Sequence, residues 1–275
     1  MNTGVVTGAQ NVGIGRYALQ NVTSGTQNVV LGSTGSAITT GNYNVAIGPG
    51  ALEANTVGTS IIAIGYHALQ DNNPASATTP MNTAVGYKAG EQVTTSEMNT
   101  FIGAEAGKTT TTGEKNTALG DDSLRDNTTG SFNTALGKWA LAQNTTADGN
   151  TGVGQEALYA NTTGTNNTAL GKGAAAQNTT ANSNTAVGNG ALTTNQTGIY
   201  NTAIGKGALF DATSSANVAV GYHASYENSS GQNNTSVGAY ALKETTTGSN
   251  NTALGNEAGD ALTTGSNNIM IGYQA

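Results

Sequence analysis

The sequence repeats one short unit along nearly its whole length, and this repeat constrains the fold more than any other feature. The unit reads Asn-Thr-Ala-Leu-Gly or a close variant, and most units begin 17 residues after the previous one. Two intervals are 16 residues long, and the interval from Ile61 to Asn82 is 21. Ile61 opens one unit; the others open at Asn11, Asn28, Asn44, Asn82, Asn99, Asn116, Asn133, Asn150, Asn167, Asn184, Asn201, Asn217, Asn234, Asn251 and Asn268.

The residues after the opening position have the pattern of a short β-strand. With the opening residue numbered 0, position +1 is Val, Ile or Thr in every unit, and position +3 is Ile, Leu or Val. Side chains alternate between the faces of a strand, and β-branched residues suit a packed, pleated surface. We therefore expect positions +1 and +3 to point into the coil. Position +2, mostly Ala or Gly, is then expected to face outward, where its small size indicates that another surface packs on it.

Position +4 is glycine in every unit, which predicts a sharp corner with positive φ or a backbone too crowded for a Cβ atom. Beyond the corner, Ala at +7 and Leu at +8, as in Ala140-Leu141, are expected to form a second short inward strand. The glycines assigned to corners include Gly15, Gly48, Gly86, Gly120, Gly137, Gly154, Gly171, Gly188, Gly205, Gly238 and Gly255.

The rest of each unit has the residues of turns, as in Asn127-Thr128-Thr129-Gly130. Stacked coils would place like residues above like, so asparagine amides are expected to form ladders along the axis. The sequence thus predicts an all-β, parallel β-solenoid of about sixteen 17-residue coils over residues 11–275. Residues 1–10 are expected to lead into or cap the first coil, and residue 275 is expected to end partway through the last.

Two other conformations fit the repeat less well. Glycine at a fixed place in every unit, with many β-branched residues, would break a helix at regular intervals. A disordered chain of low complexity has no reason to keep position +3 aliphatic in every copy.

The composition indicates association of several chains. Charged residues make up only 9% and aromatic residues only 5% of the chain, so an isolated coil would have a thin core. A homotrimer around an axis would bury the small-residue face at +2 in every protomer at once.

The unit Asn-Thr-Ala-Leu-Gly-x-x-Ala-Leu resembles the head repeats of trimeric autotransporter adhesins, which Val45-Ala46-Ile47-Gly48 and Val218-Ala219-Val220-Gly221 match directly. It is also similar to the Asn-Thr-Ala-Val-Gly arrays of phage tail-fibre proteins that carry a C-terminal intramolecular chaperone. The resemblance covers residues 11–275. It implies a left-handed β-roll, a trimer, and display on a surface for attachment. The 17-residue unit departs from the shorter repeat of the adhesin heads.

Residues for chemistry are scarce. The chain has no cysteine and no Gly-x-Ser-x-Gly motif, and its two histidines, His67 and His223, lie in distant units. The acidic pair Asp121 and Asp122 is expected to be solvated. We therefore expect no enzyme activity, no cofactor and no metal site. A net charge of −7 argues against nucleic-acid binding, and no apolar run is long enough for membrane insertion by this segment.

Surface binding, if present, is expected at exposed aromatic residues or at the insertion of residues 71–81, which should bulge from the solenoid. The aromatic side chains could stack on glycans or cover crevices between protomers. The candidates are Asn72, Asn73, Pro74, Tyr66, Trp139 and Tyr222.

These observations predict a structural and adhesive fibre segment of a phage tail fibre or bacterial surface adhesin, extracellular, with a cell-surface glycan or protein as receptor. A filament subunit that polymerises end to end is one alternative, and an ice-binding solenoid is another. The adjacent turn threonines, such as Thr145-Thr146, would point opposite ways and argue against flat threonine ranks.

Overall fold

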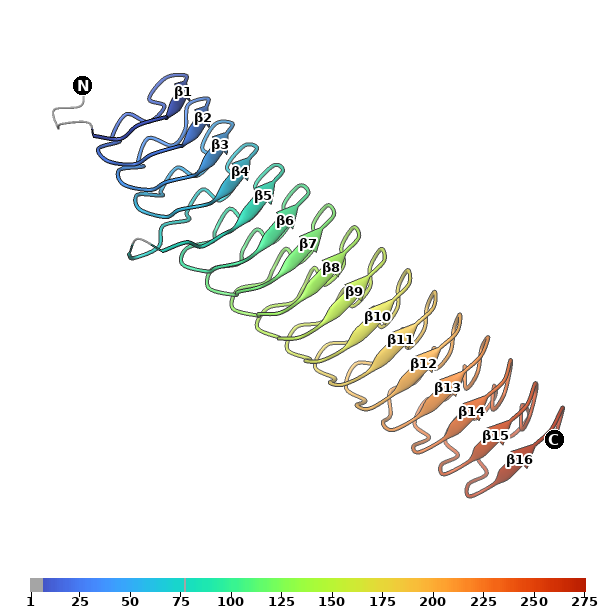
Figure 1. The fold of residues 1–275 in the computed structure, drawn as a ribbon. Helices are drawn as coiled ribbons and strands as arrows, with labels where there is room; N and C mark the ends of the chain where they lie inside the picture. Colours follow the sequence, from blue (N-terminus) through green and yellow to red (C-terminus); the bar gives the residue numbers. More distant parts are fainter. Residues whose placement is uncertain (1–6, 77) are drawn as a thin grey trace. The chain divides into compact units, whose positions relative to one another are not determined.

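The computed structural model describes residues 7–76 and 78–275, where the only regular elements are short parallel strands and turns (Figure 1). Each strand spans positions +1 to +3 of one unit, which confirms the expected all-β, parallel β-solenoid of about sixteen turns. Residues 1–6 of the expected leading segment lie outside the described residues. The strands are β1 (Val12–Ile14), β2 (Val29–Leu31), β3 (Val45–Ile47), β4 (Ile62–Ile64), β5 (Thr83–Val85), β6 (Thr100–Ile102), β7 (Thr117–Leu119), β8 (Thr134–Leu136), β9 (Thr151–Val153), β10 (Thr168–Leu170), β11 (Thr185–Val187), β12 (Thr202–Ile204), β13 (Val218–Val220), β14 (Thr235–Val237), β15 (Thr252–Leu254) and β16 (Ile269–Ile271).

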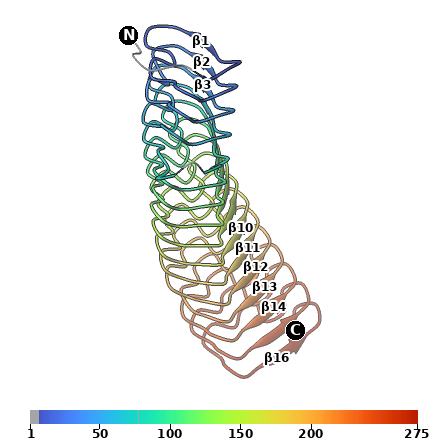
Figure 2. The ribbon, with the colours of Figure 1, turned by 60° about the vertical axis from the view of Figure 1, so that its left-hand side comes forward.

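The chain divides into two compact units, one ending at Ala135 and the other starting at Leu136, so the division falls within β8. Inside each unit, neighbouring strands pair in parallel and in register, so that Thr168 lies beside Thr185. In the C-terminal unit, β10 to β14 succeed one another along one side of the coils (Figure 2). Coils of unusual length keep the register, because Val29 pairs with Val45 and Ile62 pairs with Thr83.

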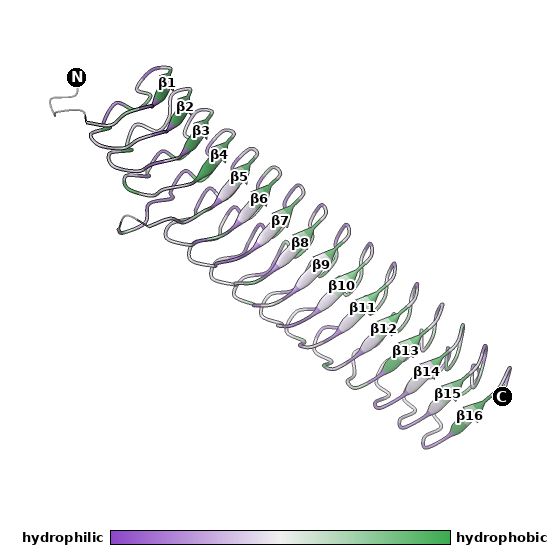
Figure 3. Ribbon diagram, viewed as in Figure 1, coloured by the Kyte–Doolittle hydropathy of each residue, from purple (hydrophilic) through white to green (hydrophobic). Residues whose placement is uncertain are grey.

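The strands face the opposite way from the sequence-based expectation. Position +2 is the inward position, and Ala46, Ala118 and Ala203 are 0% exposed inside their own coils. Positions +1 and +3 point outward, where Leu119 is 50% exposed. The prediction that +1 and +3 fill the coil is therefore wrong, and so is the argument that the +2 face packs against another chain. Figure 3 shows the hydropathy along each strand: β13 is green, whereas strands that begin with threonine, such as β11, are paler at that end.

The second inward strand predicted at +7 and +8 is also absent from the described coils, where these positions form turns. Trp139 and Leu141 have positive φ angles of 60° and 51°. Residues in the left-handed region interrupt the alternation of a strand. As a result Ala140 and Leu141 both point inward and both are 0% exposed, so the turn supplies the large side chains of the core.

The corner glycines behave as predicted. All eleven have positive φ, for example +133° at Gly188. A Cβ atom built on Gly188 would lie 2.5 Å from the carbonyl oxygen of Gly205 in the next coil. Both the backbone conformation and the close stacking of corners therefore require glycine at +4.

The asparagine ladder is confirmed. The Asn116 backbone N–H donates to Asn99 Oδ1 (2.8 Å), and Asn116 Nδ2 donates to the Gly130 carbonyl (2.9 Å). A second ladder uses the turn asparagines at +11: Asn161 Nδ2 donates to Asn144 Oδ1 (2.9 Å). Both ladders are buried, so a coil with asparagine at 0 and at +11, such as the one that opens at Asn150, places two hydrogen-bonded amides beside its alanine and leucine core.

Candidate binding hollows

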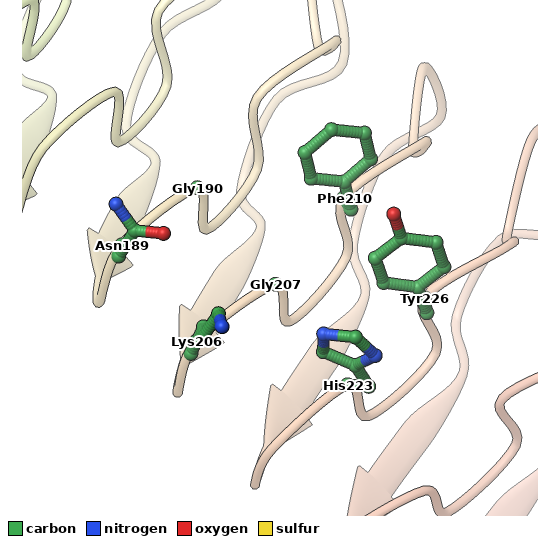
Figure 4. A pocket seen from close by; sticks show the side chains of 7 residues that line it. All are labelled: Asn189, Gly190, Lys206, Gly207, Phe210, His223 and Tyr226. Carbon is green, nitrogen blue, oxygen red and sulfur yellow. The ribbon is translucent and has the colours of Figure 1, made fainter.

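Three hollows line the flank of the C-terminal unit just beyond the corner glycines, and the side chains around them come mainly from positions +6 and +9. The N-terminal hollow, of about 320 Å³, is lined by Trp139, Glu156, Tyr159 and Ala176. The middle hollow, of about 120 Å³, includes Asn189, Gly190, Lys206, Gly207, Phe210, His223 and Tyr226 (Figure 4). The C-terminal hollow, of about 300 Å³, is lined by Tyr240, Lys243, Glu257 and Asp260.

Three consecutive coils carry glycine at +6, namely Gly173, Gly190 and Gly207. Other coils carry large residues there with the same backbone, such as Trp139 (φ 60°) and Glu156 (φ 61°). The backbone therefore does not demand glycine at these sites. Each of the three glycines removes a side chain from the flank, and a Cβ on Gly173 would meet nothing within 4 Å.

The middle hollow is walled by stacked rings from neighbouring coils. The centroids of Phe210 and Tyr226 are 5.0 Å apart with planes 9° from parallel, and His223 and Tyr226 are 4.5 Å apart at 28°. Figure 4 shows Phe210, Tyr226 and His223 grouped, with Lys206 on the same coil as Phe210. Tyr222 stacks on the His223 ring at 4.0 Å. Such stacks hold the rings as flat, preformed walls.

His223 is the member of this cluster whose pKa is lowered. Burial lowers the pKa of its imidazole below 6.5, and the nearby ammonium groups of Lys206 and Lys243 lower that pKa further. The ring lies over Gly207, where a Cβ atom would come within 2.8 Å of His223 Cδ2. A larger residue at Gly207 would therefore displace the histidine.

The predicted aromatic candidates lie in different places. Trp139 lines the N-terminal hollow, and Tyr222 borders the middle one through its stack on His223. Tyr66 belongs to the N-terminal unit, where it is 44% exposed and stacks on His67 at 3.8 Å and on Tyr87 at 5.5 Å. The structure therefore brings Tyr222 and Trp139 to one flank and keeps Tyr66 in a separate cluster.

The insertion candidates are only partly at the surface. Asn73 is exposed and accepts hydrogen bonds from Thr56, as expected. The prediction for Asn72 is wrong, because Asn72 falls at +11, the position of the second buried asparagine ladder, and is 0% exposed. Pro74 is also buried, with its Cγ 3.1 Å from the Cβ site of Gly58. Residues 75 and 76 are exposed, and residue 77 lies outside the described residues.

Three further residues of the hollows were not among the sequence-based candidates: Tyr159, Phe210 and Tyr226, which supply ring faces from +9. The sequence does show these aromatic residues recurring at one position of the 17-residue repeat, in or near the coils that have glycine at +6. This recurrence was overlooked because +9 follows what was expected to be a strand rather than a turn.

Other polar groups pair locally. His67 Nδ1 lies 3.3 Å from Glu91 Oε1, and Lys88 Nζ lies 3.1 Å from the same oxygen. Arg125 pairs with Asp126 at 2.8 Å and with Asp122 at 3.7 Å. Residues 7–76 and 78–275 contain no group of three or more His, Asp or Glu side chains placed to hold a metal ion. In the same part of the chain, no helix is long and apolar enough to cross a membrane.

No family model, curated protein or solved structure matches the chain.

Proposed function

We propose that this chain is a structural and adhesive fibre segment that acts without catalysis as a homotrimer on the surface of a virion or bacterium. The observation that carries the proposal is the outward strand face. Each strand presents Val, Ile or Thr at its first residue and Ile, Leu or Val at its third, and none of these positions carries a charge. Leu170 and Leu254 on this face are each 48% exposed.

An uncharged face with an exposed aliphatic row is typical of an interaction surface. Its rows recur in register from coil to coil, as Leu170 lies beside Val187 and Val187 beside Ile204. A second copy with parallel rows presents the same spacing, so identical chains can pack row against row. Three copies around an axis would bury this face in each protomer, as closed symmetry favours. A left-handed β-roll, implied by the resemblance to adhesin heads, belongs to the same proposal.

The attachment role rests on the rest of the surface. Turns rich in Thr, Asn and Gly present hydroxyl and amide groups, and the aromatic hollows lie beyond the corner glycines, away from the strand face. A trimer joined through its strand faces therefore leaves the flanks free for a cell-surface glycan or protein receptor.

Sedimentation equilibrium tests the assembly. We expect the wild-type chain to sediment as three copies. The double variant Leu170→Lys and Leu254→Lys should sediment as a monomer with an unchanged β circular dichroism spectrum, because two lysines in the +3 row place charge in the interface. Gln177→Lys is the control, since Gln177 is exposed at position +10 outside the face. A monomeric wild-type protein overturns the trimer, and a polymer that lengthens with concentration favours end-to-end filaments.

Ice binding stays a second candidate because the structure turns one threonine row outward. Thr168, Thr185 and Thr202 lie side by side at +1 on the strand face. The +3 row is aliphatic, so the face lacks the paired threonine ranks that the ice-binding hypothesis requires. Measuring thermal hysteresis distinguishes the two functions. A difference between the melting and freezing temperatures that disappears in Thr185→Lys would favour ice binding over the fibre.

A further inference from the structure

We propose that the N-terminal and middle hollows together bind one acidic saccharide chain that runs across the coils. This inference deepens the proposed attachment function by naming a receptor chemistry. The two hollows occupy adjoining coils, because Ala176 of the first lies one coil before Gly190 of the second. Neighbouring coils are about 4.8 Å apart, so ring walls three coils apart, such as Tyr159 and Phe210, are separated by roughly 14 Å.

The walls suit sugar rings. A pyranose has a face of C–H groups and an edge of hydroxyl groups, so it needs a flat apolar wall beside polar side chains. Phe210 and Tyr226 provide such a wall, with their rings stacked 5.0 Å apart and both partly exposed. Asn189 lines the same hollow with its amide, and Glu156 lines the N-terminal one with its carboxylate.

The hollows are open because side chains are absent between the walls. Gly190 lines the middle hollow directly, and a Cβ there would make only ordinary contacts, 3.5 Å from Phe210 and Thr193. Gly173, one coil earlier, faces open space. A chain-like ligand can therefore pass from one hollow to the next along this stretch.

The lysines at and just before the middle hollow favour an acidic sugar. Lys172 and Lys206 are exposed at position +5, two coils apart, with Asn189 between them. Lys206 lines the middle hollow, and its Nζ lies 5.9 Å from the Tyr222 ring centroid. Two ammonium groups separated by roughly 10 Å can each meet a carboxylate of a repeating uronate.

Isothermal titration of the full chain with an α-1,4-linked galacturonate hexamer and a β-1,4-linked glucose hexamer tests the site. We expect the galacturonate hexamer to bind at least about tenfold more tightly. Gly190→Gln should weaken its binding by about tenfold or more, because other coils carry Glu and Trp at +6 on the same backbone while the new side chain fills the hollow. Lys206→Gln should remove most of the preference for the acidic hexamer.

Tyr200→Ala is the matched control, since Tyr200 is 65% exposed outside the hollows and Ala216 holds the equivalent position with the same φ of 60°. Equal thermal melting of all variants shows that they fold. The proposal is overturned if neither hexamer binds, if both bind equally, if Gly190→Gln binds as wild type does, or if Tyr200→Ala weakens binding as much. If no saccharide binds but the wild-type protein is a trimer, the fibre proposal stands. If the wild-type protein is a monomer and still binds the saccharide, only the trimer is ruled out.

Discussion

The ring of Phe101 occupies the space that a leucine fills at position +8 in other coils, because a Cβ atom at Gly107 would lie 2.4 Å from Phe101 Cε1. Phe101 stands at +2, where most coils have alanine, and Gly107 stands at +8, where Leu124 follows in the next coil. The large side chain of the core therefore comes from the strand here and not from the turn. Met270 and Gly259 make the same kind of exchange near the end of the described coils, with Met270 as the large residue. Ser225 and Ser236 occupy the corresponding positions elsewhere, and their Oγ atoms form a 2.9 Å hydrogen bond.

This exchange predicts coupled effects on stability. We expect Phe101→Ala to lower the free energy of unfolding by about 3 to 5 kcal/mol, because it leaves a cavity. Gly107→Leu alone should also destabilise, by about 1 to 3 kcal/mol, because two large groups compete for one space. The double variant should regain much of the loss, since it restores the alanine and leucine of the next coil. Urea denaturation of the four proteins measures the coupling, and additive losses would show that the two residues act independently.

Corner and flank glycines should differ in their tolerance of alanine. Gly188→Ala places a Cβ 2.5 Å from the Gly205 oxygen at a φ of +133°, so we expect a loss of about 3 kcal/mol or more. Gly173→Ala is the control, with φ of +65° and no atom within 4 Å of the new Cβ. Its loss should be about 1 to 2 kcal/mol, the cost of the left-handed conformation alone. Thermal melting compares them, and equal losses would contradict a special role for the corner.

The second asparagine ladder predicts sensitivity to a single atom. Asn161 Nδ2 donates to Asn144 Oδ1 and to the Gly164 carbonyl, both at 2.9 Å. Asn161→Asp replaces this donor with an oxygen that faces two acceptors in a buried site, which should cost about 3 kcal/mol or more. Lowering the pH should restore part of the loss, because the protonated carboxyl can donate one bond. Exposed Asn166→Asp is the control and should show neither effect.

His223 predicts a pH dependence of stability. Its pKa in the folded protein lies below 6.5, chiefly through burial and next through Lys206 and Lys243. Between the folded pKa and 6.5 the unfolded chain binds more protons than the folded chain, so the stability contributed by neutral His223 falls as pH decreases through this window. His223→Asn should remove this part of the pH dependence in urea denaturation. NMR titration should also show a higher His223 pKa in Lys206→Gln, and an unchanged value would contradict the role of that lysine.

The amino-acid sequence by itself determined the coil. The 17-residue period places each strand, glycine at +4 places each corner, and the repeated asparagines imply amide ladders. These inferences hold because they depend on backbone geometry and on like residues meeting like, which stacking of equal units guarantees. The flank that holds the hollows was predicted only in part. Trp139 and Tyr222 were identified from the sequence, but Phe210 and Tyr226 were not grouped with them.

Only the tertiary structure decided which strand face is inside. Alternation groups +1 with +3 and opposes both to +2, but it does not say which group turns inward. The coil is narrow, and left-handed residues at +6 and +8 send leucines such as Leu141 and buried asparagines such as Asn144 into it. Where the turn supplies a leucine, the space left beside the strand accepts only a small side chain, so Ala135 points in while the larger Leu136 turns outward.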